Sequence, residues 1–267
     1  MELEYYKNII NKRLKERDFL FKKTLQIEKK PDFLHIQSLI LYSEIGMLNL
    51  NLDRNATFQA KQEFFKLLRA SEFEIWYETG LYPDLIGNRN PYFKCVSTLS
   101  GSIADLFLCD HEEALKYVFN YSFEYEKDRK VKSKFDFIIQ SFLFLMIVEK
   151  EKAKLILKEE YKRSDEYIRS LANVVGGILY DDLKLINKGI NYQINYGTGE
   201  HGPEANYHHK ATGLAKIALR FGMEPDLSDS RINKKLLEHE KVDYVDIDNL
   251  FEALGVEPIM RHSLRNY

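Results

Sequence analysis

Apolar side chains recur at three- and four-residue steps along most of this chain, and this spacing restricts the possible folds more than any other feature of the sequence. Residues spaced in this way lie on one face of an α-helix. No long stretch alternates apolar with polar residues as a half-buried strand would, and the 267 residues include only 13 glycines and 6 prolines. We therefore predict an all-α fold.

The N-terminal third of the chain has the pattern of three helices. They are predicted over Leu3–Ile27, Phe33–Leu50 and Thr57–Thr79. The segment Gly80–Pro91 is rich in turn-forming residues and follows the third of these helices. We predict that residues 1–90 form an N-terminal helical region, which packs with residues 91–267 as one domain.

Beyond residue 90, an apolar helix, a tight charged turn and a second amphipathic helix follow one another repeatedly. The turns lie near Asp110, Lys150 and Asp181, about 30–40 residues apart, which is within the range of helical-hairpin repeats. This spacing predicts an irregular array of antiparallel helical hairpins. The turn Asp110-His-Glu-Glu113 also has the spacing of a capping box, which predicts that a helix opens at Asp110.

Charge and cysteine content indicate an ordinary globular protein. The net charge of -2 gives no overall attraction to nucleic acid or to an anionic membrane, so neither partner is expected. Cys95 and Cys109 lie in apolar surroundings, where two buried reduced thiols are typical. The charged N-terminal stretch lacks the apolar run of a signal peptide. Together these features predict a cytoplasmic protein.

The stretch Gly199–Ser230 contains three histidines and allows two interpretations. If a helix begins at Pro203, Glu204 and His208 share one face and His201 lies close to them, a set that could bind the metal of a hydrolase. No HExxH pair and no obvious fourth ligand accompany these residues. Alternatively, Glu204 is a first-turn acid and the histidines are half-exposed polar residues or partner contacts. We expect the second interpretation, in which these residues form no catalytic, cofactor or metal site.

The remainder of this stretch predicts a buried central helix. Its apolar stripe comprises Tyr207, Ala211, Leu214, Ala218 and Phe221. Small residues, including Gly213 and Ala215, would allow a neighbouring helix to approach closely. Gly222 fits the position just after the helix end, and Pro225 follows soon after it.

The segment GLAKIALRFGMEPDLSDSRINKKLL, Gly213–Leu237, resembles the immunity protein 49 family of bacterial polymorphic-toxin systems. It joins a small-residue helix of the type GLA-x-x-ALR-x-G to an acidic link and a final Leu-Leu pair. The preceding GGILYDDLKLINKGINYQINYG is similar to the same family, and the resemblance covers Leu99–Leu237. It implies a cytoplasmic antidote that binds and blocks a co-encoded toxin and is not an enzyme.

Contacts with such a toxin are expected first on acidic turns, because many toxin domains act on nucleic acid and are basic. These residues are Asp110, Glu112, Glu113, Asp181 and Asp182. The alternative surface is the loop Tyr196–Glu204, and its contact residues are Tyr196, Glu200, His201 and Glu204. Nearby tyrosines such as Tyr192 and Tyr207 could supply aromatic anchors. The other function that the residues allow is a helical-repeat interaction or regulatory module.

Overall fold

The computed structural model describes residues 2–26, 45–46, 49, 53, 56–79, 95–127, 134–146, 149–157, 166–195, 207–240 and 244. Its regular elements are α1 (Glu2–Gln26), α3 (Thr57–Thr79), α4 (Cys95–Leu106), the 3₁₀ turn η1 (Phe107–Cys109), α5 (Glu112–Glu126), α6 (Lys134–Met146), α7 (Lys150–Ile156), α8 (Glu166–Tyr180), α9 (Leu183–Asn195), α10 (His209–Arg220) and α11 (Lys234–Leu237). No strand occurs within these ranges. The predicted all-α fold is therefore confirmed.

Two of the three helices predicted near the N-terminus coincide with α1 and α3. Most of the remaining predicted helix, Phe33–Leu50, lies outside the described residues. The segment Gly80–Pro91 and the predicted domain boundary at residue 90 also lie outside them. Within the described ranges, none of the helices combines the length and the apolar character that crossing a membrane requires.

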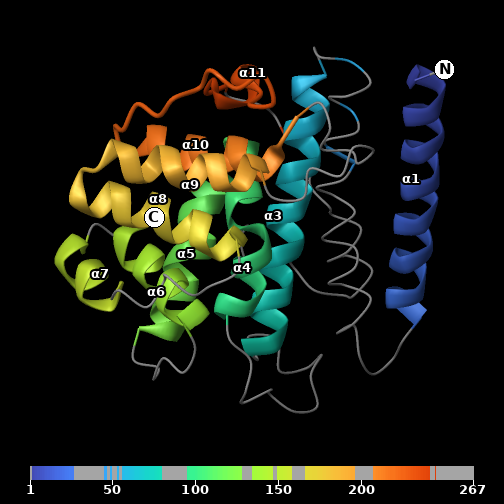
Figure 1. Ribbon diagram of the computed structural model, residues 1–267. Coiled ribbons are helices and arrows are strands. Elements are labelled where there is room, and N and C mark those ends of the chain that lie inside the picture. Colours follow the sequence, from blue (N-terminus) through green and yellow to red (C-terminus); the bar gives the residue numbers. More distant parts are fainter. Residues whose placement is uncertain are drawn as a thin grey trace.

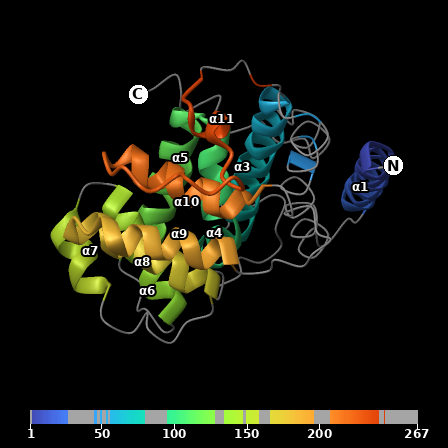
Figure 2. The same cartoon turned by 45° about the horizontal axis from the view of Figure 1, so that its top comes forward.

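Helices that follow one another in the chain pack together: α8 lies against α9, and α6 against α7 (Figure 1). Helix α4 contacts α3, α6 and α10, so α3 shares a core with the later helices. Helix α1 stands apart from this group in both views (Figures 1 and 2). The irregular array of antiparallel hairpins, with its loose repeat, remains a prediction.

Helix α10 is the buried central helix that the sequence predicts. Every residue from 211 to 218 is buried, and the helix packs against α4, α9 and η1. At Gly213 an added Cβ would lie 2.1 Å from the carbonyl oxygen of Ala104, so the backbones of α10 and α4 touch there. Only a residue without a side chain permits this approach.

The end of α10 also matches its prediction. Gly222 has a φ of 77°, which places it in the left-handed region that favours glycine. Its N–H donates to the carbonyl of Leu219 (3.0 Å), and the N–H of Met223 donates to that of Ala218 (3.1 Å). These two bonds form the Schellman motif that ends many helices.

Replacing either small residue on the buried face, Ala215→Leu or Ala218→Leu, should lower the free energy of unfolding by about 1–3 kcal/mol, because three extra carbons must enter a packed contact. Both alanines are fully buried. Chemical denaturation measures the change. Lys116→Leu, on the exposed side of α5, is the control and should stay within about 0.5 kcal/mol. Equal midpoints for all three variants would contradict a central position for α10.

An aromatic cluster fixes η1 at the start of the region where the candidate site lies. The ring of Phe107 lies 5.6 Å from that of Phe119 on α5 and 5.9 Å from that of Phe142 on α6. All three side chains are buried. Such ring contacts add to the free energy gained from burial, so η1 and the residues that follow it have a well-defined position.

Candidate functional site

Asp110 follows η1 directly and does not cap α5. Its φ of 57° is left-handed, and the N-cap of α5 is His111, whose Nδ1 accepts the N–H of Ala114 (3.2 Å). The predicted capping box that opens at Asp110 is therefore wrong. The N-cap of α5 is therefore His111, one residue later than predicted, and the carboxylate of Asp110 is bound elsewhere.

That carboxylate is the centre of a buried ion cluster. One of its oxygens lies 2.6 Å from Nζ of Lys61 on α3, and the other contacts Nζ of Lys216 on α10. The side chain of Asp110 is 2% exposed and that of Lys61 is fully buried. Asp110 thus joins two helices from inside the protein. The prediction that Asp110 is a partner contact is therefore wrong, because its side chain is buried. Its negative charge instead balances the buried charges of Lys61 and Lys216.

Helix α11 and the chain after it contact this cluster. The ammonium of Lys61 donates to the carbonyl of Glu238 (3.0 Å), and that of Lys216 donates to the carbonyl of Leu236 (2.5 Å). The hydroxyl of Tyr244 donates to the carbonyl of Cys109, and its ring stacks on Phe65 at 4.7 Å. The two buried lysines therefore bind the C-terminal segment as well as Asp110.

Burial governs the titration of groups around the cluster. It raises the pKa of the Cys109 thiol to about 12, against the opposing effects of a backbone hydrogen bond from His111 and of the Lys216 charge. Burial also raises the pKa of Tyr244 and lowers that of Lys216, the latter against the attraction of Asp110. Cys109 is buried and protonated at neutral pH, so it is not a reactive thiol.

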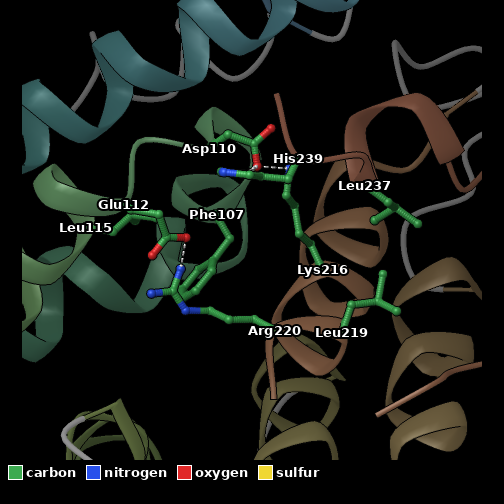
Figure 3. Close-up of a pocket in the computed structure, with 9 residues that line it drawn as sticks. All are labelled: Phe107, Asp110, Glu112, Leu115, Lys216, Leu219, Arg220, Leu237 and His239. Carbon is green, nitrogen blue, oxygen red and sulfur yellow. Dashed lines mark hydrogen bonds and ion pairs between the residues drawn. The ribbon is translucent and has the colours of Figure 1, made fainter. Parts of the chain in front are cut away.

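A pocket of about 300 Å³ adjoins the cluster, between η1 and α5 on one side and α10 on the other (Figure 3). Its walls are Phe107, Asp110, Glu112, Leu115, Lys216, Leu219, Arg220, Leu237 and His239. The guanidinium of Arg220 binds the carboxylate of Glu112 and lies 5.5 Å from the ring centroid of Phe107. Within the pocket, Lys216 therefore pairs with Asp110 and Arg220 pairs with Glu112, and the other walls are mostly apolar.

Of the acidic residues predicted around this turn, Glu112 is held by Arg220 and Glu113 is exposed on the first turn of α5. The structure thus brings Asp110 and Glu112 together in one pocket, although as partners of basic residues. Lys61, Lys216 and Arg220 were not identified from the sequence. Lys216 could have been recognised from the sequence, because it lies within GLAKIAL, a run of small and apolar residues. A lysine in a buried helix needs a polar or acidic partner.

The turn between α8 and α9 presents the other predicted acids to solvent. Asp181 has a φ of 56°, and Oδ1 of Asp182 accepts the N–H of Leu185 (3.1 Å), which caps α9. Both aspartates are exposed, and their role as partner contacts stays a prediction. Two large apolar side chains flank them: Tyr180 is 58% exposed and Leu183 is 40% exposed. We call residues 180–183 the acidic turn.

The histidine stretch differs from its prediction. The helix begins at His209 and not at Pro203, because His208 has an extended backbone and its Nδ1 accepts the N–H of Ala211 as the N-cap. His209 contacts Asp105 on α4 at 2.6 Å and is buried. The remaining predicted residues, Tyr196, Glu200, His201 and Glu204, lie outside the described residues. No group of three or more metal-binding side chains is found in the part that the structure describes.

Comparison of the chain with family models, curated proteins and solved structures finds no match. The resemblance of Leu99–Leu237 to the immunity protein 49 family therefore stays a prediction from the sequence. Within that segment, α10 packs against α4, α9 and η1, and α8 packs against α9.

Proposed function

We propose that this chain is an immunity protein, which acts in the cytoplasm by binding a toxin domain and blocking it through protein–protein contact. The resemblance of Leu99–Leu237 to a family of such proteins supports the proposal. The structural observation that carries it is the acidic turn, in which two exposed carboxylates stand between two exposed apolar side chains.

This combination suits a protein interface. Exposed apolar residues that are scattered singly are common, but here Tyr180 and Leu183 lie within one short turn. Leu155 on the neighbouring helix α7 is also exposed, and Nζ of Lys154 lies 5.8 Å from the ring centroid of Tyr180. Tyrosine is enriched among the residues that contribute most to binding, because its ring buries a large area at small entropic cost.

The carboxylates of the acidic turn would guide association. Among the described residues, no basic side chain pairs with Asp181 or Asp182 as Lys61 and Lys216 pair with Asp110, and both aspartates are exposed. A basic toxin surface would be attracted to them over several ångströms, which raises the association rate and fixes orientation. The tight α8–α9 packing would hold the turn in place before the partner arrives, so little ordering is needed on binding.

Co-expression with the toxin encoded beside this chain tests the proposal. We expect the unmodified protein to protect cells and to bind with a dissociation constant at or below about 1 nM, as blocking a lethal enzyme requires. Tyr180→Ala should weaken binding by about 2 kcal/mol through faster dissociation. Asp181→Asn with Asp182→Asn should slow association, since asparagine retains the turn and the cap but removes both charges.

Glu124→Gln is the matched control, because this carboxylate is also exposed but lies on α5. It should leave protection and affinity unchanged. If the acidic-turn variants bind as well as this control, the contact surface lies elsewhere. If the unmodified protein neither binds the toxin nor protects, the immunity proposal itself fails.

A further inference from the structure

Helix α9 carries a polar stripe along its outer side. The side chains that line a shallow hollow of about 450 Å³ there are Lys184, Asn187, Lys188, Asn191, Tyr192 and Asn195. We call these six residues the α9 stripe. Their spacing of three and four places them on one helix face over three turns. Among the described residues, this lining contains two cations, three amides and one phenol, and no carboxylate.

Positive charge is concentrated around Tyr192. Nζ of Lys188 lies 5.7 Å from its ring centroid, and the guanidinium carbon of Arg169, on α8, lies 5.8 Å from it. Attraction between a cation and an aromatic ring holds both groups beside the hollow. Asp226 contacts the stripe through its backbone, because its N–H donates to Oδ1 of Asn187 (2.9 Å) while its carboxylate accepts the N–H of Ser228 (2.9 Å). The stripe therefore suits an anionic partner.

The three asparagines are separated by four residues each, at positions 187, 191 and 195. Four residues of α-helix rise by roughly 6 Å. Two residues of extended peptide advance by roughly 6.6–6.8 Å, so successive asparagine amides can meet every second peptide group of an extended chain. Lys184 and Lys188 repeat at the same four-residue interval and would meet every second side chain of that chain.

We infer that the α9 stripe binds an extended segment of a partner protein that carries carboxylates at alternate positions. The asparagine amides would bind the backbone of the segment, and the lysines would pair with its acidic side chains. The identity of the partner as a toxin rests on the proposed function. The stripe follows the acidic turn directly in the chain. The α8–α9 hairpin would therefore present negative charge at the acidic turn and positive charge along the α9 stripe. A partner with the complementary charges could bind in only one orientation.

Fluorescence anisotropy with the full chain tests this inference without any toxin. The probe is a labelled peptide Asp-Thr-Asp-Thr-Asp-Thr-Asp, and its comparison is Asp-Asp-Asp-Asp-Thr-Thr-Thr, which has the same composition and charge. We expect the alternating peptide to bind more tightly. Lys184→Gln with Lys188→Gln should weaken its binding roughly tenfold, as expected for loss of two exposed ion pairs with shared geometry. Asn191→Leu should weaken it without any change in charge.

Lys150→Gln with Lys152→Gln is the matched control on α7, where both lysines are exposed; it should bind the alternating peptide like the unmodified protein. Equal affinity for the two peptides, or no binding of either, would overturn the inference. Tighter binding of a single-stranded oligonucleotide, lost in the same α9 variants, would also overturn it by identifying a nucleic acid as the occupant. Protection by the unmodified protein is measured separately, so failure of the stripe and failure of the immunity proposal give different results.

Discussion

Asp110→Asn should lower the free energy of unfolding by about 3–5 kcal/mol, because it leaves two buried ammonium groups without their shared counter-charge. The amide keeps the shape of the side chain and tolerates the left-handed backbone at this position. What it removes is the charge that Lys61 and Lys216 both contact. Urea denaturation, followed by far-UV circular dichroism, measures the change.

The control for this prediction is Asp181→Asn. The two aspartates share a left-handed backbone, with φ of 57° and 56°, but Asp181 is exposed. Its substitution should change the free energy of unfolding by no more than about 0.5 kcal/mol. Similar losses at both positions would show that backbone conformation, and not the buried charge, determines the stability at Asp110.

The helices could be predicted from the sequence because the signals that define them are local. Apolar spacing and a glycine that can adopt a positive φ are properties of a few consecutive residues, and α3 and the end of α10 at Gly222 agree with them. The wrong prediction at the start of α5 arises because distant residues bind the side chain that the local pattern assigns to an N-cap. Asp110 has the spacing of an N-cap, but lysines from α3 and α10 bind its carboxylate.

The candidate site could be predicted only in part for the same reason. Exposed acids in a two-residue turn, such as Asp181 and Asp182, are recognisable from their neighbours in the chain, and the structure places them on the surface. The buried pairs cannot be recognised in this way. Asp105 and His209 lie on different helices, and only the packing of α4 against α10 brings them to 2.6 Å. A single sequence indicates that a buried lysine or histidine needs a partner but not which partner it has.

The close approach of α10 to α4 at Ala104 requires a glycine at position 213. Gly213→Ala should lower the free energy of unfolding by about 3 kcal/mol, despite the better helix propensity of alanine. The new Cβ would lie 2.1 Å from the carbonyl oxygen of Ala104 and 2.5 Å from its carbonyl carbon. Both are backbone atoms, so no rotation of a side chain can relieve the overlap, and the two helices must separate.

Gly176→Ala provides the matched comparison, since Gly176 also lies inside a buried helix, α8. The nearest atoms to its added Cβ are methyl carbons of Leu185 at 3.3 Å and Leu157 at 3.4 Å, which belong to the ends of flexible side chains. The gain in helix propensity, about 1 kcal/mol, should therefore offset a slight crowding and leave stability unchanged or raised. Thermal and urea denaturation of both variants would distinguish the two contacts. If Gly213→Ala is as stable as Gly176→Ala, α10 does not approach α4 through its backbone at this position.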